Sequence, residues 1–282
     1  MQRNNNYSPL RYPGGKTRLI NFIKDVINLN ELNGGVYIEP YAGGASLALS
    51  LIIDGCMERV VINDYDRSIY AFWHSVIYHT DELVDRILST PITPEEWIKQ
   101  RNVQRCKATT SIIDLAFSTF FLNRTNRSGI LKAGIIGGMA QNGTYKIDAR
   151  FNKEILVGKI QKIASYKDRI TVSNYDAIKL ISRYRNVGHK NLFFLDPPYY
   201  VKGRDLYVSY YRDSDHVALA QAIQRRNNLN WLMTYDEHPR ILDLYNNCRI
   251  TKYQLVYSAG ESRQGAELLI SSGGLQLPRE KL

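Results

Sequence analysis

The stretch that decides the fold is residues 192–199, Leu-Phe-Phe-Leu-Asp-Pro-Pro-Tyr, in which a short apolar run ends in a carboxylate, two prolines and a tyrosine. A run of this length bounded by turn residues predicts a buried strand of a parallel sheet. The carboxyl ends of such strands face the ligand crevice of an α/β protein, so we expect Asp196 to lie at a binding site. Pro197 and Pro198 lack backbone N–H groups and stiffen the turn that follows.

This turn suits an amino group conjugated to a purine ring, whose lone pair is delocalised and poorly nucleophilic. The Asp196 carboxylate and the Pro197 carbonyl could accept its two N–H bonds, which favours the geometry in which the lone pair points at a methyl donor. Tyr199 offers a ring face on which the base could stack. We take Asp196, Pro197 and Tyr199 as candidate catalytic residues. The competing interpretation is a rigid turn whose aspartate only caps the next element.

Strand and helix patterns alternate along most of the chain. Short strands are expected at 36–39, 60–62, 170–172, 192–195, 231–234, near 251–257 and at 266–270. Helical patterns separate the first five, which predicts an α/β fold with a mostly parallel sheet flanked by helices. The alternation stops within residues 79–164, where helical patterns follow one another. We therefore predict a core domain of residues 1–78 and 165–282, with a mainly helical insertion at 79–164.

Two further motifs indicate a nucleotide-like ligand. Glu39-Pro40-Tyr41-Ala42-Gly43-Gly44 joins the first strand to its helix, where glycines let a ligand approach the backbone and the helix N-terminus offers free N–H groups. Asp64 closes the second strand, where an acidic residue can accept hydrogen bonds from ribose hydroxyls. A plain glycine turn and a helix cap are the alternatives. The spacing matches neither the dinucleotide-binding nor the P-loop motif.

The N-terminal stretch Leu10-Arg-Tyr-Pro-Gly-Gly-Lys16 places an aromatic ring four residues before a lysine, across a Pro-Gly-Gly turn. Tyr12 could pack on a cofactor, and Lys16 could pair with a cofactor carboxylate. An ordinary turn is the alternative interpretation.

Composition favours a polyanionic partner and a reducing compartment. Lys and Arg number 37 against 27 Asp and Glu, a net charge of +10, which suits the phosphates of nucleic acid. Cys56, Cys106 and Cys248 are far apart, which predicts neither a disulfide framework nor a zinc site. No stretch approaches the roughly 20 apolar residues of a membrane span, and the N-terminus lacks a signal-peptide core. We expect a cytoplasmic protein without a membrane partner.

Taken in order, five features resemble the Dam-like DNA adenine methyltransferases, including modification enzymes of restriction systems. They are the R-Y-P-G-G-K turn, the motif that starts at Glu39, Asp64, Phe121-Leu-Asn-Arg124 and Asp196-Pro-Pro-Tyr199. The resemblance spans nearly the whole chain. It implies a Rossmann-like methyltransferase fold and S-adenosylmethionine as methyl donor, with S-adenosylhomocysteine as product and no metal. The implied reaction is site-specific methylation of the N6 amino group of adenine in double-stranded DNA, after the base flips into the D-P-P-Y pocket.

The resemblance also implies roles for individual residues. Tyr12, Lys16, Asp64 and Asp196 match positions that contact S-adenosylmethionine in that family, and Asp176, in Asn174-Tyr-Asp176, looks like its adenine-ring contact. With the glycine turn, the predicted cofactor site comprises Tyr12, Lys16, Glu39, Ala42, Gly43, Asp64, Asp176 and Asp196. The family order of motifs identifies the insertion at 79–164 as the target-recognition domain.

DNA contacts are predicted in the insertion and after the D-P-P-Y turn. The candidates are Arg124, Asn126, Arg127, Lys132, Lys202 and Arg204. Arginine and asparagine can read guanine and adenine edges, whereas lysine mostly contacts phosphate. Solvated charged loops are the alternative. GATC-specific members typically continue with Gly-Tyr-Asn-Gly after Asn123-Arg124, whereas this chain reads Thr125-Asn-Arg-Ser-Gly, so a GATC target is not expected.

Two alternative functions stay open at this point. The first keeps the chemistry but moves it to RNA, cytosine or a protein glutamine; Asp196 favours adenine, because cytosine-amino enzymes more often carry Ser there and glutamine enzymes Asn. The second is a non-catalytic nucleic-acid-binding protein that kept the fold. We expect a monomer that acts on duplex DNA, with a cognate restriction endonuclease as a possible partner.

Overall fold

The computed structural model describes residues 6–12, 14–186, 188, 190–201, 211–225, 229–257 and 263–279, without the side chains of 254–257 and 263–266. Two of the residues predicted to bind DNA, Lys202 and Arg204, lie outside the described residues. None of the helices in these ranges combines the length and hydrophobicity that a membrane span requires.

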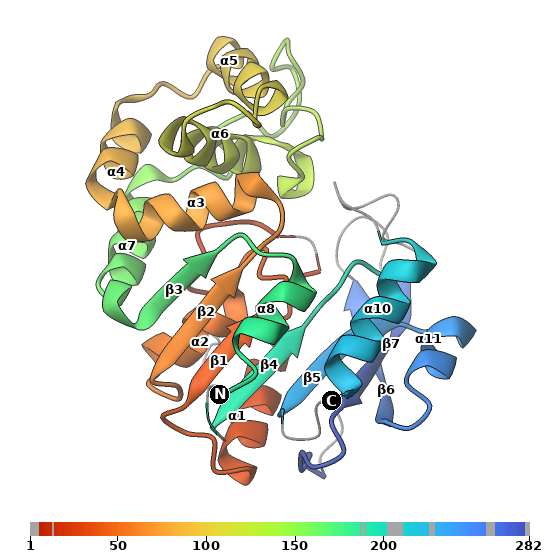
Figure 1. Ribbon diagram of the computed structural model, residues 1–282. Coiled ribbons are helices and arrows are strands. Elements are labelled where there is room, and N and C mark those ends of the chain that lie inside the picture. The colour runs from red at the N-terminus through yellow and green to blue at the C-terminus, as the bar shows by residue number, and fades with distance from the viewer. Residues whose placement is uncertain are drawn as a thin grey trace.

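A seven-stranded sheet in the order β3-β2-β1-β4-β5-β7-β6 runs through the molecule (Figure 1). Its strands are β1 (Val36–Glu39), β2 (Arg59–Asn63), β3 (Ile170–Ser173), β4 (Asn191–Leu195), β5 (Trp231–Asp236), β6 (Arg249–Tyr257) and β7 (Arg263–Ser271). The first five pair in parallel, and β7 pairs antiparallel with both β5 and β6. The prediction of a mostly parallel sheet in a Rossmann-like fold is confirmed.

Helices cover both faces of this sheet. Helices α1 (Ile20–Leu29) and α2 (Ser46–Ile53) lie on one face, and α8 (Ala177–Arg183), α10 (Asp213–Gln224) and α11 (Pro239–Leu244) lie on the other (Figure 1). Successive side chains of a strand point to opposite faces, so a strand covered on both sides must be apolar throughout. In β4, Leu192 and Phe194 enter the core with α1, whereas Phe193 and Leu195 enter the core with α10.

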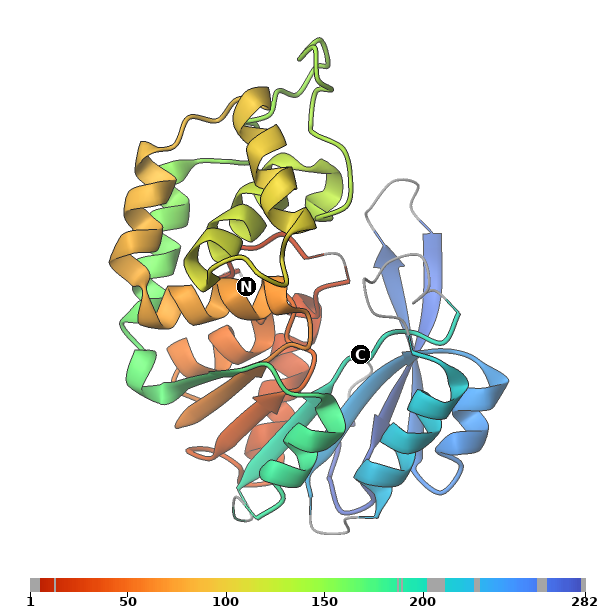
Figure 2. The same cartoon turned by 45° about the horizontal axis from the view of Figure 1, so that its top comes forward.

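A second group of helices gathers on the side of β3, away from β6 and β7, in both views (Figures 1 and 2). It comprises α3 (Arg67–Tyr78), α4 (Thr80–Ser89), α5 (Pro94–Arg105), α6 (Ile112–Thr125) and α7 (Lys153–Ala164). Thr93 caps α5 by accepting the Glu96 N–H at 3.2 Å. Helix α6 is apolar on nearly all sides because it is enclosed by its neighbours; its Phe120 stacks on Phe72 of α3 with ring centroids 5.8 Å apart.

The carboxyl ends of β1, β2 and β3 are joined by one buried side chain. Asn63, the last residue of β2, donates to the Pro40 carbonyl at 2.9 Å and to the Tyr175 carbonyl at 3.0 Å. Its Oδ1 atom accepts the Tyr175 N–H at 2.8 Å. These bonds fix the turns after β1 and β3 relative to β2, at the sheet edge where the predicted site residues lie.

Candidate active site

Asp196 follows β4 directly and receives hydrogen bonds on both carboxylate oxygens. The Lys16 ammonium lies 2.9 Å from its Oδ2 atom, and the Thr234 hydroxyl of β5 donates to Oδ1 at 2.6 Å. Lys16 also donates to the Tyr199 hydroxyl at 2.9 Å. The arm before α1 and the D-P-P-Y turn, which are far apart in sequence, therefore meet at this carboxylate.

Burial changes the pKa values of both titratable side chains of this turn, Asp196 and Tyr199. It raises the pKa of Asp196 above the ordinary aspartate value, while Lys16 and Thr234 lower it in part. Burial and the nearby Asp196 carboxylate also hold the pKa of Tyr199 well above its usual range, so its hydroxyl stays protonated. Lys16 acts as the counter-ion that stabilises the charged form of Asp196.

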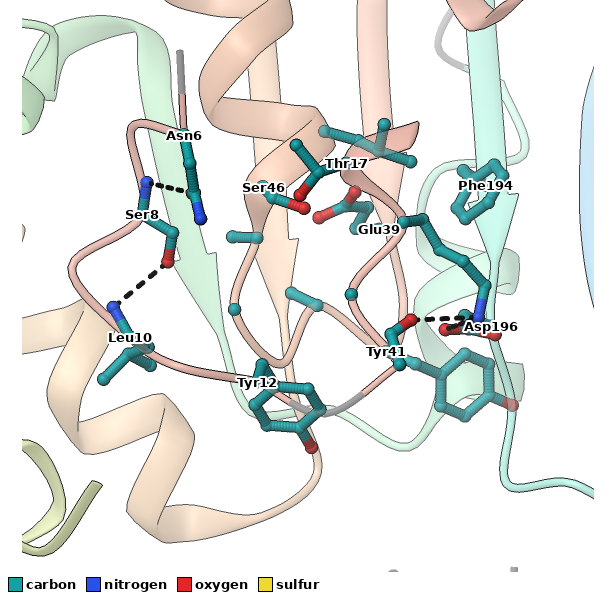
Figure 3. A pocket seen from close by; sticks show the side chains of 17 residues that line it. Asn6, Ser8, Leu10, Tyr12, Thr17, Glu39, Tyr41, Ser46, Phe194 and Asp196 are labelled. Atoms are coloured by element: carbon teal, nitrogen blue, oxygen red, sulfur yellow. Dashed lines mark hydrogen bonds and ion pairs between the residues drawn. The ribbon is translucent and has the colours of Figure 1, made fainter. Parts of the chain in front are cut away.

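A pocket opens beside Asp196 between the N-terminal arm and the β1–α2 turn (Figure 3). The residues that line it include Tyr12, Lys16, Glu39, Tyr41, Ala42 and Asp196. Its volume of about 70 Å³ is well below the ~300–1,000 Å³ of sites that enclose a whole ligand. The pocket therefore suits one end of a ligand whose remainder lies outside it.

Glu39 brings an unsatisfied acceptor into this pocket. Its side chain is 5% exposed; Oε1 accepts the Tyr37 hydroxyl at 3.0 Å, and Oε2 is buried without a hydrogen-bond partner among the described residues. Burial raises the pKa of Glu39 to about 8, and the Tyr37 hydroxyl and the Ala48 backbone N–H offset part of this effect. A buried carboxylate oxygen without a partner is a natural acceptor for a ligand ammonium group.

The Tyr12 ring, which lines the pocket, lies against the backbone of Gly43, which does not. Gly43 has a φ of +46°, and a Cβ atom added to it would lie 2.6 Å from Tyr12 Cε1. Only glycine permits both this backbone conformation and the approach of the ring. The Trp73 indole N–H donates to the Gly43 carbonyl at 2.8 Å and holds the turn from behind.

Asp64 lies on the other side of the glycine turn and does not line the pocket. Its Oδ2 atom accepts the Gly43 N–H and its Oδ1 atom accepts the Asp66 N–H, both at 2.9 Å. Burial, together with the neighbouring Asp66 carboxylate, raises the pKa of Asp64 to about 7. Each Asp64 oxygen accepts one of these two N–H groups and can still accept a second hydrogen bond.

Asp176 is the N-cap of α8. Its exposed side chain accepts the Ile178 N–H at 2.9 Å and the Lys179 N–H at 3.4 Å, and it does not line the pocket. The predicted contact of Asp176 with the cofactor stays a prediction. Within the described ranges, no group of three or more His, Cys, Asp or Glu side chains is arranged to hold a metal ion.

The DNA-binding candidates in the insertion differ in exposure. Arg127 and Lys132 are exposed, whereas Arg124 is partly buried and donates to the Arg150 carbonyl at 2.6 Å. Burial and the charges of Arg11 and Arg150 lower the pKa of Arg124 to about 10. Like charges thus gather around Arg124, and no carboxylate pairs with it in the described part of the chain.

Asn126 is fully buried, and its amide serves the insertion itself. It donates to the Ile130 and Leu131 carbonyls, both at 3.0 Å, and accepts the Trp97 indole N–H at 2.6 Å. The side chain therefore organises the loop that carries Arg127 and presents no free polar atom to a ligand in this structure.

Sequence reasoning missed three residues around the D-P-P-Y turn: Thr234, Asp236 and Glu267. Asp236 ends β5 just as Asp64 and Asp196 follow their strands, a signal that could have singled it out. Glu267 lies 3.8 Å from the Lys16 ammonium and accepts the Tyr253 hydroxyl at 2.6 Å. Its place in the antiparallel strand β7 carried no such signal.

Comparison with known proteins identifies the family of this chain. Residues 12–259 match the family model of the D12 class N6 adenine-specific DNA methyltransferases. The chain belongs to this family. The Type II methyltransferase M.MjaIII of Methanocaldococcus jannaschii is 21% identical over 287 aligned positions, which cover 93% of this chain and 97% of the relative. This D12 class enzyme thus has the predicted activity, methyl transfer from S-adenosylmethionine to the N6 amino group of adenine in DNA.

Proposed function

We propose that this D12 class methyltransferase binds the amino-acid end of S-adenosylmethionine in the pocket beside Asp196 and presents a flipped adenine to the Asp196–Tyr199 turn. One observation carries the proposal: Tyr12, Lys16, Glu39 and Asp196 line a single pocket. When bound, S-adenosylmethionine supplies an electrophilic methyl group on its sulfonium.

The donor set fits such a cofactor. The partnerless Oε2 atom of Glu39 suits the cofactor ammonium, and Lys16 at the same pocket suits its carboxylate. Because the pocket holds only one end of a ligand, the ribose is expected to extend past Tyr12 and Gly43 toward Asp64. Ala42 lines the pocket beside the cofactor, and Asp176 would meet the far, adenine end.

The turn itself would activate the adenine amine. Each Asp196 oxygen already has one partner, Thr234 on Oδ1 and Lys16 on Oδ2, so an amine N–H would use a second lone pair or displace the Lys16 ammonium. The Pro197 carbonyl would accept the second N–H, and Tyr199 would stack on the base. The carboxylate also favours the positive charge that develops on the nitrogen as the methyl group arrives.

We assign DNA recognition to residues 79–164, as a target-recognition domain inserted between residues 1–78 and 165–282. The positive cluster around Arg124 suits a DNA phosphate, because its members repel one another and lack carboxylate partners in the described ranges. Arg127 and Lys132 are exposed for contacts with base edges or phosphates. Lys202 and Arg204 keep their predicted role after the D-P-P-Y turn.

Three points of biological context are proposals as well. M.MjaIII is named as a Type II methyltransferase, which supports a role in restriction–modification and a cognate endonuclease for this chain. We also propose that the enzyme acts as a monomer and in the cytoplasm. Measurement of the mass of the purified enzyme in solution, with and without DNA, would test whether it is a monomer.

The direct test compares the wild-type enzyme with Asp196→Ala on DNA from a methylation-free host. Labelled methyl groups should enter DNA as N6-methyladenine with the wild-type enzyme, and the variant should lose about a hundredfold or more of the rate. Thermal unfolding should show that the variant still folds. Asp243→Ala, which removes an exposed carboxylate on α11, is the control and should methylate normally.

Two results would contradict the proposal. A product of N4-methylcytosine or methylated RNA would move the chemistry to another substrate. A wild-type enzyme that binds DNA but incorporates no label would favour a non-catalytic binding protein.

A further inference from the structure

The backbone that follows the D-P-P-Y turn is held by a carboxylate of the neighbouring strand. Asp236, the last residue of β5, accepts the Tyr200 N–H on Oδ1 at 2.8 Å and the Val201 N–H on Oδ2 at 2.9 Å. The Asp236 side chain is only 7% exposed. Both of its oxygens are therefore engaged with the chain just after Tyr199.

The double proline explains why a side chain is needed there. β4 and β5 pair in parallel as far as Leu195 opposite Met233, so the ladder ends where Asp196 begins. Pro197 and Pro198 have no N–H groups with which to continue it. The N–H groups of Tyr200 and Val201, which come after Tyr199, are beyond the ladder, and the Asp236 carboxylate supplies the acceptors that the strand backbone no longer offers.

Asp236 shares this task with a second residue of the same strand. Thr234 lies two positions earlier, on the same face of β5, and donates to Asp196 Oδ1 at 2.6 Å. Thr234 thus binds Asp196, the first residue of the turn. Asp236 binds Tyr200 and Val201, which directly follow the last residue of the turn, Tyr199. The turn is fixed at both ends by side chains of one buried strand.

We propose that Asp236 is a positioning residue for methyl transfer. By holding the backbone of Tyr200 and Val201, it fixes the positions of the preceding Tyr199 ring and Pro197 carbonyl. This inference rests on the proposed function of the Asp196–Tyr199 turn. Both hydrogen bonds of Asp236 are to backbone groups of the loop, and Asp236 does not line the pocket beside Asp196. Its effect on the reaction is therefore indirect.

Removal of this carboxylate would leave two N–H groups without an acceptor and one end of the turn free. The side chain of Tyr200 would stay held, because its ring stacks on His238 with centroids 4.2 Å apart and its hydroxyl donates to Asp213 Oδ1 at 3.1 Å, but the backbone next to Tyr199 would lose its acceptors. A displacement of about 1 Å at a reacting group can cost roughly a hundredfold in rate. The loss should appear in turnover, because the pocket for the amino-acid end of the cofactor is formed by other residues.

The experiment compares Asp236→Ala, Asp236→Asn and Glu237→Ala in the full chain on unmethylated plasmid DNA. Glu237 is the matched control, since it is the adjacent acidic residue and pairs with Lys252 at the surface. Asp236→Ala should lower kcat by about tenfold to a hundredfold. The Kd for S-adenosylmethionine should stay within about twofold, well under the 1.4 kcal/mol that a tenfold change represents. Glu237→Ala should match the wild type.

Asp236→Asn keeps the shape and one acceptor oxygen, so it should fall between the wild type and the alanine variant. The asparagine variant also tests the positioning role if Asp236→Ala does not fold. A folded Asp236→Asn with wild-type kcat would overturn the proposal. Equal losses of kcat and cofactor affinity would do the same, because they indicate general damage. A wild-type enzyme that leaves adenine unmethylated would instead refute the proposed function.

Discussion

The side-chain amide of Asn123 pairs with both backbone groups of Arg11. Its Oδ1 atom accepts the Arg11 N–H and its Nδ2 atom donates to the Arg11 carbonyl, both at 2.8 Å. Asn123 belongs to α6, whereas Arg11 directly precedes Tyr12 in the N-terminal arm. Helix α6 thus holds the segment that carries Tyr12 and Lys16 to the pocket.

We predict that Asn123→Ala weakens cofactor binding although Asn123 does not line the pocket. The substitution leaves partly buried backbone groups of Arg11 without partners, which should cost about 1–3 kcal/mol of unfolding free energy. It also frees the arm, so the Kd for S-adenosylmethionine should rise. Calorimetry and thermal unfolding measure the two effects. A drop in stability with unchanged cofactor affinity would show that the arm keeps its place without this pair.

Glu39 should make cofactor binding depend on pH. Its pKa in the folded protein is about 8, so the side chain is mostly protonated at pH 6 and must lose a proton to pair with an ammonium. The affinity for S-adenosylmethionine should therefore increase between pH 6 and 7.5, a range in which a free α-amino group, with a pKa of about 7.7–8.0, stays mostly charged. Calorimetry in buffers of different ionisation enthalpy should show proton release on binding.

Glu39→Gln is the control for this dependence and should bind the cofactor more weakly with a flatter pH profile. The same pKa has a consequence for the free protein. Because the folded value lies above the unfolded value near 4.5, the contribution of Glu39 to stability is fully present below pH 4.5 and is lost as the pH rises through 8. If the cofactor affinity of the glutamine variant depends on pH as strongly as that of the wild type, the pH effect belongs to another group, such as Asp64.

Gly43→Ala should impair the site more than its backbone strain alone explains. The new Cβ atom would meet the Tyr12 ring, and a non-glycine residue at positive φ costs about 1–3 kcal/mol. Gly55→Ala is a matched control, since Gly55 has a φ of +75° but no atom within 4 Å of an added Cβ. Both variants should unfold at lower temperature, and only Gly43→Ala should lose cofactor affinity. Equal cofactor affinities in the two would remove Tyr12 from the binding site.

The positive cluster around Arg124 should contribute to the salt dependence of DNA binding. Arg124→Ala removes its central charge, so the slope of log K against log salt should fall by about 0.9 for each phosphate that is no longer neutralised. Arg59→Ala is the control, because Arg59 is exposed at the amino-terminal end of β2, the opposite edge of the sheet. Fluorescence anisotropy over a salt series measures both. Identical slopes in the two variants would exclude a phosphate contact at Arg124.

The sheet was predictable because both of its faces are covered. A strand buried on both sides must be apolar throughout, and the expected strand at 192–195 accordingly differs from β4 by one residue. The antiparallel pair was less clear: β7 begins at Arg263, three residues before the expected start, because its first residues carry the mixed polarity of a hairpin end. The burial of Asn126 could not be foreseen, since an asparagine in a polar loop carries no local sign of its tertiary environment.

The placement of acidic residues at the ends of parallel strands was predictable from the sequence alone. Asp64 and Asp196 stand where parallel strands deliver their carboxyl ends, and the glycine turn after Glu39 follows the same rule. Which groups meet there was decided by tertiary packing, because hydrogen bonds between distant segments leave no local pattern. Lys16 reaches Tyr199 across 183 positions, and Asp236 holds Tyr200 across 36. Local residue order determined where each functional group sits on its strand, and the packing of arm, sheet and inserted helices determined its partners.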